Sequence, residues 1–289
     1  MSKSILVTGA SAGFGKDAAE TLAKAGHQVF ATVRDRNGRS RAVAEELRAK
    51  RIEVLELDVT NDASVDAAFK ALYSKTGGKL DVLINNAGLF AAGLSETYTP
   101  EQVRDMFEVN VFGIQRVTRA ALPAMRKSKS GLIINIGSIL GRVTIPFLGL
   151  YGASKFAVEA LTESYRYELS QLGVDVVLVQ PSAYPTKLYT SLLPPSEPDR
   201  AAEYGEVAAL PGEFNKFIGG LFSGPNSPNP HDISEALAKL IDTPNGKRPD
   251  RVVVGASFGA AEVNSAVQPI QAAMIKSIGF EPLTKLKVQ

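Results

Sequence analysis

Two side chains that can move a proton stand one helical turn apart in the middle of the chain. Tyr151 and Lys155 are four positions apart at the start of a segment with helical periodicity, so we expect both on one helix face. A free tyrosine has a pKa of about 10 and is a poor acid or base near neutrality. A neighbouring ammonium favours the phenolate and would lower that pKa. The pair therefore predicts general acid–base chemistry in which Tyr151 gives or takes the proton.

A glycine-rich turn, residues 8–15 with the sequence TGASAGFG, lies between a short apolar run and an amphipathic segment. Glycine lets a backbone turn tightly and approach a pyrophosphate, and the N-terminus of the next helix offers free N–H groups. The sequence therefore predicts a dinucleotide site here. The contacts expected from this turn are Gly9, Ser11, Gly13, Phe14 and Gly15.

The same turn also fits a different chemistry. Gly9, Ser11 and Gly13 match the Gly-x-Ser-x-Gly pattern of serine hydrolases, as do residues 255–259. These enzymes need a histidine after the serine; none follows Ser257, and Ser11 has only His231. A nucleophile on the first strand would also precede the whole fold that must support it. Hydrolase chemistry is the weaker hypothesis, and ester cleavage lost on Ser11→Ala would reveal it.

The residues after the second apolar run bear on the choice of dinucleotide. An acidic residue about 20 positions past the glycines usually binds the adenosine ribose hydroxyls. Arg34 stands at that place instead, and Arg36, Arg39 and Arg41 follow it. Guanidinium groups match a phosphate, so the sequence predicts NADP(H) bound through Arg34, with Arg39 and Arg41 in solvent. Asp35 keeps NAD(H) open as an alternative, provided that its side chain points inward.

Composition excludes several other classes of function. The 289 residues are 45% hydrophobic and 21% charged, with a net charge of +2, which is ordinary globular usage without the charge excess of nucleic-acid or membrane-surface binding proteins. The absence of cysteine excludes disulfides and thiolate metal sites, and His27 and His231 lack metal-ligand spacing, so we expect no metal. No apolar run resembles a signal peptide or a membrane span. We therefore expect a cytoplasmic protein.

The elements that must position these residues alternate along the chain. Short, nearly all-apolar runs, typical of strands covered on both faces, occur at residues 5–8, 29–33, 54–57, 82–85, 132–137, 174–180 and 251–254. Helical patterns occur at residues 14–25, 41–50, 63–73, 101–125 and 153–172. This alternation predicts one α/β domain over residues 1–289, with a Rossmann-type, doubly wound parallel sheet of about seven strands. Ligands of such sheets bind beyond the carboxyl ends of the strands.

One stretch, residues 181–231, breaks the alternation. It holds nine of the sixteen prolines, from Pro181 to Pro230, and many large apolar residues. Long loops usually serve as lids or binding loops, and a disordered linker would be less apolar. We expect this stretch to be a substrate-covering loop; the alternative is a loop that packs on its own domain or on a neighbouring chain. Residues 255–289 form a C-terminal extension whose role stays open.

Together these motifs resemble those of the short-chain dehydrogenase/reductase family, in its single-domain branch. The likeness runs from Ile5 to Thr186, with a weaker match at residues 251–254. It rests on the pattern TGxxxGxG, the Asp58-Val59 pair and the sequence NNAG at residues 85–88. It also rests on four residues that match the family's catalytic tetrad in order and spacing, Asn110, Ser138, Tyr151 and Lys155. One departure is that the family's usual Pro-Gly after the sixth strand is Pro181-Ser182 here.

The resemblance implies a role for each member of the set. Ser138 would donate a hydrogen bond to the substrate oxygen, Tyr151 would supply the proton, and hydride would pass directly from the cofactor. Lys155 would hold the nicotinamide ribose and depress the pKa of the tyrosine, and Asn110 would anchor a water. Further cofactor contacts are implied at Asp58, Val59, Asn86, Ala87, Gly88, Pro181 and Thr186. Family members commonly pair through two long helices, so a homodimer or homotetramer is implied.

The substrate prediction rests on apolar residues near the set. The expected pocket residues are Phe90, Leu140, Phe147, Tyr184 and Leu188. They predict an apolar ketone or aldehyde, or the corresponding alcohol, and the stretch 31–35 resembles the hydroxysteroid and retinol dehydrogenase branch. Two alternatives stay open. One is an NAD-dependent secondary alcohol dehydrogenase of the same fold, and the other is a dinucleotide-sensing binding protein without catalysis.

Overall fold

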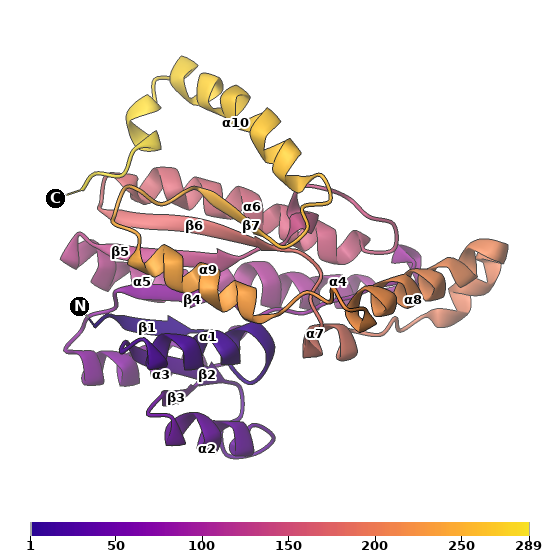
Figure 1. Cartoon of the computed structure of the whole chain (residues 1–289), viewed down its shortest axis with the longest axis horizontal. Helices are drawn as coiled ribbons and strands as arrows, with labels where there is room; N and C mark the ends of the chain where they lie inside the picture. The colour runs from indigo at the N-terminus through magenta and orange to yellow at the C-terminus, as the bar shows by residue number, and fades with distance from the viewer. Residues whose placement is uncertain (1, 289) are drawn as a thin grey trace.

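Seven parallel strands form one sheet in the computed structural model, which describes residues 2–288 (Figure 1). The strands are β1 Ser4–Val7, β2 Gln28–Val33, β3 Glu53–Glu56, β4 Val82–Asn85, β5 Gly131–Ile136, β6 Val174–Pro181 and β7 Arg251–Val254. Their order in the sheet is β3-β2-β1-β4-β5-β6-β7, so the winding reverses between β1 and β4. The predicted Rossmann-type sheet is confirmed, and each predicted strand agrees with the structure to within one residue at either end.

Helices cover both faces of the sheet, because successive strand residues point to opposite sides. In β1, Ile5 and Val7 pack with α1 Gly13–Lys24, α2 Arg41–Ala49 and α9 His231–Asp242. Leu6, between them, packs on the other face. That face is covered by α3 Asp62–Thr76, α5 Gly113–Ser128 and α6 Gly149–Ser170. The carboxyl ends of the strands remain at one edge, where a ligand can reach them.

The single helix predicted over residues 101–125 is wrong in one respect. The structure divides the segment into α4 Pro100–Phe107, a π-helical turn Glu108–Phe112, and α5. The side chain of Asn110, in the π-helical turn, accepts from and donates to the backbone of Leu89 after β4. Such turns interrupt α-helices frequently at functional sites, and this one places a buried amide beside the carboxyl edge of the sheet.

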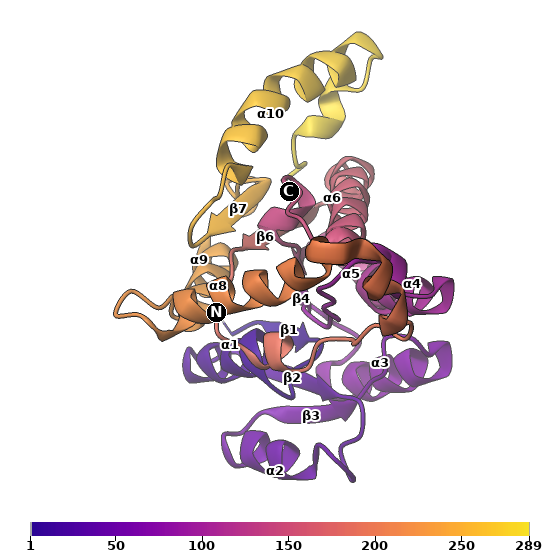
Figure 2. The same ribbon diagram turned by 90° about the vertical axis from the view of Figure 1, so that its right-hand side faces the viewer.

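The stretch after β6 is largely helical, which corrects the predicted loop. It contains α7 Lys187–Thr190, a 3₁₀ run Pro198–Ala209 and α8 Leu210–Ser223. Pro198 and Pro211 stand in the first turns of their helices, where the missing N–H costs nothing, so these prolines start helices rather than prevent them. The stretch extends from the carboxyl edge of the sheet, and α8 crosses in front of the strands when viewed from that side (Figures 1 and 2).

The C-terminal extension forms α10 Ala260–Ser277 and a 3₁₀ turn Glu281–Thr284. Helix α10 stands off from the sheet (Figure 1), and Asn264 ties it back by donating to the Gln180 side chain at 2.7 Å. Within residues 2–288, no helix combines the length and the apolar character needed to cross a bilayer.

Candidate active site

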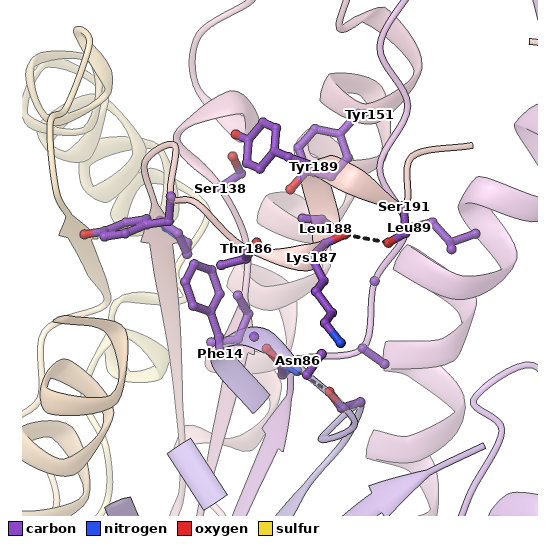
Figure 3. Close-up of a pocket in the computed structure, with 18 of the residues that line it drawn as sticks. Phe14, Asn86, Leu89, Ser138, Tyr151, Thr186, Lys187, Leu188, Tyr189 and Ser191 are labelled. Atoms are coloured by element: carbon purple, nitrogen blue, oxygen red, sulfur yellow. Dashed lines mark hydrogen bonds between the residues drawn. The ribbon is translucent and has the colours of Figure 1, made fainter. Parts of the chain in front are cut away.

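A cavity of about 760 Å³ lies at the carboxyl edge of the sheet. The segments after β1 to β6 line it from below, and α7 and α8 contribute side chains from above. Figure 3 shows Ser138, Tyr151 and Tyr189 at one end of this cavity and Phe14 and Asn86 at the other. The cavity is thus elongated, and it lies where ligands of doubly wound sheets bind.

The glycine turn and the segment after β4 are bonded to each other. The amide of Asn86 donates to the carbonyls of Thr8 and Gly9 at 2.9 and 3.1 Å. A Cβ on Gly9, whose φ is +68°, would lie 2.8 Å from the Cα of Ala87. A Cβ on Gly15 would overlap the amide of Asn86 and the carbonyl of Gly9. These glycines are therefore required by close backbone approach.

Most of the predicted dinucleotide contacts reach the cavity. The residues that line it are Gly9, Ser11, Gly13, Phe14, Arg34, Asp58, Val59, Asn86, Ala87, Gly88, Pro181 and Thr186. Gly15, the exception, does not line it, because it is packed beneath Asn86. The structure therefore gives Gly15 a place in the packing of the glycine turn against Asn86 rather than a place on the cavity wall.

The serine-hydrolase alternative finds no support in the geometry. Ser11 lines the cavity, but His231 does not. The Nδ1 atom of His231 bonds the carboxylate of Asp17 at 2.8 Å, and the hydroxyl of Ser234 donates to the same carboxylate. Both groups are thus committed to Asp17, and His231 is not arranged as a base for Ser11.

The end of the cavity beside β2 is basic. Arg34 and Arg39 both line it, so Arg39 is not the purely solvated residue that the sequence suggested. Arg41, in contrast, is exposed and pairs with Glu45 at 2.9 Å. Ser40, the residue after Arg39, is buried and also lines the cavity. The sequence did not predict this contact, because a single serine in a loop is not a specific sign of a binding site.

Asp35 points away from the cavity. Its carboxylate accepts the backbone N–H groups of Gly38 and Arg39 at 2.7 and 3.0 Å, and these hydrogen bonds lower its pKa. The side chain is therefore occupied in stabilising its own turn. It does not take the inward orientation on which the NAD(H) alternative depended.

The charges around the cavity suit an elongated anionic ligand. The charged lining residues are the cations Arg34, Arg39, Lys155 and Lys187 and the single acid Asp58. The carboxylate of Asp58 is already occupied by the hydroxyl and N–H of Thr60. Helix α1 begins at the glycine turn without a side-chain cap, so its first N–H groups are open to an anion. The residues present thus fit a dinucleotide phosphate chain.

Helix α6 brings Tyr151 and Lys155 together at the opposite end, and both are buried. The Lys155 ammonium lies 5.5 Å from the centroid of the Tyr151 ring and donates to the carbonyl of Ile136 at 2.8 Å. Burial lowers the pKa of Lys155 to about 8. The two side chains therefore share one face of the helix, as their spacing predicts.

The predicted depression of the tyrosine pKa is not observed. Burial raises the pKa of Tyr151 above its ordinary value, the nearby phenol of Tyr189 raises it further, and only a hydrogen bond with Ser138 acts in the opposite direction. The ammonium of Lys155 lies 5.5 Å from the centroid of the ring and donates to the carbonyl of Ile136, and it does not offset the burial of the phenol. The phenol of Tyr151 is therefore neutral in this state.

Ser138 and Asn110 are positioned differently from each other. Ser138 follows β5 and lines the cavity, while its hydroxyl oxygen accepts the N–H of Leu140 at 3.1 Å. Asn110 is fully buried and does not line the cavity. Its amide donates to the carbonyl of Leu89 and to the hydroxyl of Ser154, both at 3.0 Å. Asn110 thus joins the segment after β4 to helix α6.

The apolar part of the cavity differs from the predicted pocket at three positions. Leu140 and Leu188 line it, whereas Phe90 and Phe147 do not line the cavity at all. Tyr184 lines the cavity against Phe14 at its other end, with 5.5 Å between ring centroids. Phe90 is buried behind the Tyr151 ring, with 4.8 Å between ring centroids. Phe147 has a φ of +67°, a left-handed backbone conformation that is rare for a residue other than glycine.

Further lining residues come from helices α7 and α8, which the sequence did not predict, and from the turn before α10. The helical ones are Tyr189, Phe214, Phe217, Ile218 and Leu221, and the turn contributes Phe258. The apolar character of residues 184–222 was the available signal, but only helix α8 decides which of these side chains turn inward.

Comparison with known proteins identifies the family. Residues 3–196 match the family described as short chain dehydrogenase. The 3-ketodihydrosphingosine reductase of Bacteroides thetaiotaomicron is 43% identical over 182 residues, which are 63% of this chain and 64% of that protein, less than two thirds of its length. Retinol dehydrogenase 8 of Bos taurus is 30% identical over 254 residues, 83% of this chain and 78% of that protein.

Solved structures agree with this assignment. A short-chain dehydrogenase from Streptomyces avermitilis has a TM-score of 0.76 and 31% identity, with 96% of each chain covered. A 3-ketoacyl-(acyl-carrier-protein) reductase from Brucella melitensis, solved with NADH, has a TM-score of 0.71, 28% identity and coverage of 87% and 95%. A metagenomic short-chain oxidoreductase solved with NADP has a TM-score of 0.66, 29% identity and coverage of 87% and 96%. The chain therefore belongs to the short-chain dehydrogenase family of oxidoreductases, which use nicotinamide dinucleotides.

Proposed function

We propose that the protein is an NADP(H)-dependent oxidoreductase that interconverts an apolar ketone or aldehyde and its alcohol. The observation that carries this proposal is the polarity of one cavity. Ser138, Tyr151 and Lys155 line one end, and Arg34 and Arg39 line the other. A phosphate on the adenosine ribose would meet the two guanidinium groups, while the nicotinamide end would lie beside the phenol.

In the proposed mechanism the dinucleotide supplies or accepts the hydride, and the protein supplies the proton and the placement. Burial keeps the Tyr151 phenol protonated, so it can donate to the carbonyl oxygen during reduction. Because the Ser138 oxygen already accepts the N–H of Leu140, its own O–H remains free to donate to the same substrate oxygen. These two donors stabilise the negative charge that develops there.

Lys155 holds the ribose of the dinucleotide in this proposal. One of its N–H groups is committed to the carbonyl of Ile136, which fixes the direction of the side chain. The remaining N–H groups face the cavity that Lys155 lines. A pKa near 8 keeps most of this amine protonated at neutral pH, so it can stabilise negative charge on the phenol oxygen.

The apolar walls support an apolar substrate. Beyond Tyr151 the cavity is bounded by Leu140, Leu188 and the inward face of α8, which contributes Phe214 and Leu221. The walls beyond Tyr151 carry no charged side chain among the described residues, and Figure 3 shows the Lys187 ammonium directed toward Asn86 at the other end. A sugar phosphate or hydroxy acid would therefore find no cationic partner on these walls.

The deciding experiment is a panel of apolar ketones, aldehydes and alcohols assayed with NADPH and with NADH. Turnover with NADPH, together with a lower Kd for NADPH than for NADH, is expected. A lower Kd for NADH with turnover would instead establish an NAD-dependent alcohol dehydrogenase. Binding of either dinucleotide without turnover of any substrate would establish a dinucleotide-sensing protein.

We also propose that the chain forms a homodimer or homotetramer in the cytoplasm. Phe112, in the π-helical turn before α5, is 51% exposed, and Phe156 on α6 is 43% exposed. Large apolar side chains exposed to solvent at the start of α5 and on α6 support an interface between copies in which these two side chains are buried. Light scattering of the purified protein tests the assembly, and a monomeric mass would contradict it.

A further inference from the structure

Tyr189 is a second phenol at the reactive end of the cavity. It belongs to α7 and lines the cavity. Its ring is held by two aromatic neighbours, Phe90 at 4.8 Å and Phe222 at 5.1 Å between centroids. Contacts of this kind from both the body and helix α8 fix the ring, so its hydroxyl has a defined place.

The hydroxyl of Tyr189 forms no hydrogen bond with residues 2–288 in the structure, and it is not enclosed by them, because the half-buried side chain lines the cavity. Two other interior phenols find protein acceptors: Tyr73 donates to the carbonyl of Ala120 at 3.2 Å, and Tyr98 donates to that of Ala92 at 3.1 Å. Buried polar groups are almost always hydrogen-bonded. Since Tyr189 faces the cavity, its missing partner belongs to whatever fills that cavity.

The reacting centre lies close to this free hydroxyl. The rings of Tyr151 and Tyr189 both lie 4.8 Å from the ring of Phe90, so the two phenols are neighbours across one shared side chain. Figure 3 shows both tyrosines beside Ser138 at the same end of the cavity. A substrate oxygen bound by Ser138 and Tyr151 therefore has Tyr189 within reach of its neighbouring atoms.

The protonation state of Tyr189 decides which partner it takes. Burial raises its pKa to about 12, so the hydroxyl is neutral at physiological pH and can donate a hydrogen bond. No carboxylate lines this end of the cavity among the described residues, and Asp58 lies at the other end, so no charged acceptor competes for the proton.

We propose that Tyr189 is a specificity-determining residue that donates a hydrogen bond to a second polar group on the carbon next to the reacting carbonyl. The substrate class is then an apolar ketone with an oxygen or nitrogen acceptor beside the carbonyl. This inference rests on the proposed function and narrows its substrate. A plain apolar ketone would bury the Tyr189 hydroxyl without a partner, which is unfavourable.

The test compares three ketones that share one alkyl chain: methyl decyl ketone, hydroxymethyl decyl ketone and methoxymethyl decyl ketone. For each, kcat/KM is measured with saturating NADPH in the native enzyme and in Tyr189→Phe. The variant should lower the ratio of hydroxymethyl to methyl ketone kcat/KM by about tenfold, the effect of one hydrogen bond. The ratio for the methoxymethyl ketone, which can only accept, should fall similarly.

Comparing ratios removes the intrinsic reactivity of each ketone, which is the same in both proteins. Tyr204→Phe is the matched control, because Tyr204 lies in the same covering stretch, donates to Glu96 at 2.7 Å and does not line the cavity. It should leave both ratios unchanged. Equal losses on all three ketones in Tyr189→Phe, or a loss confined to the hydroxymethyl ketone, would overturn the proposal. Failure of the native enzyme to reduce any ketone would instead contradict the proposed function itself.

Discussion

Glu159 and Arg142 form a buried ion pair, with 3.2 Å between Oε2 and Nε, that joins helix α6 to the turn after Ser138. Glu159 stands one helical turn beyond Lys155, and its carboxylate also pairs with Arg251 at 3.0 Å. The turn approaches so closely that a Cβ on Gly141 would lie 2.7 Å from the Cγ of Glu159. This ion pair thus connects the turn that follows Ser138 to helix α6, which carries Tyr151.

Replacing this carboxylate should therefore destabilise the fold. Glu159→Gln leaves the buried guanidinium of Arg142 without its counter-ion, which should lower the free energy of unfolding by about 3 kcal/mol. Urea denaturation of the purified proteins measures it. Glu101→Gln is the control, because its pair with Arg104 is in solvent and should contribute little. Equal stability of both variants would show that the ion pair is not important.

Tyr151→Phe should abolish turnover and keep cofactor binding. The phenol is the proposed proton donor, whereas the ring packs against Phe90 and keeps its place without the hydroxyl. We expect kcat to fall by about 10²- to 10⁴-fold, the usual contribution of general acid–base catalysis. The Kd for NADPH, followed by its fluorescence, should change little. Substantial remaining reductase activity would contradict the mechanism.

The two arginines that line the basic end should determine the preference for NADPH. Replacing Arg34 and Arg39 together by alanine removes the charged donors proposed for the ribose phosphate. The Kd for NADPH should rise by about tenfold or more, and the Kd for NADH much less. Arg36→Ala is the comparison, because Arg36 pairs loosely with Glu56 and does not line the cavity. A parallel loss of NADH affinity would refute phosphate recognition.

The buried ammonium of Lys155 should make stability depend on pH. Its pKa is about 8 in the folded chain and 10.5 when exposed, so the unfolded chain binds more protons between these values. Folded-state stability should therefore rise with pH in this window, by up to about 1.4 kcal/mol per pH unit. Below the window both states are protonated, and the unfavourable burial of the charge is fully present.

Urea denaturation between about pH 7 and about pH 9 measures this dependence, where the tyrosines of the unfolded chain still keep most of their protons. Lys155→Met is the reference, because it removes the titrating group and keeps a long side chain. The unfolding free energy of the native protein minus that of Lys155→Met should increase with pH. Parallel curves would mean that Lys155 does not titrate in this range.

Local features of the sequence determined the sheet and much of the site. The apolar runs that become strands are buried on both faces, so their composition alone marks them, and the glycine turn follows from backbone geometry. The Tyr151–Lys155 spacing likewise places both on one helix face, wherever that helix lies. These inferences needed only neighbouring residues.

Contacts between distant segments decided the rest. Asp35 turned back into its own loop and Arg39 turned into the cavity because the backbone after β2 sets their directions. Phe90 became the support behind Tyr151 and Tyr189, although nothing in its neighbours along the chain indicates such a place. Side-chain direction, burial and pKa depend on what packs against a residue from elsewhere in the fold, and that information arises only when the chain is folded.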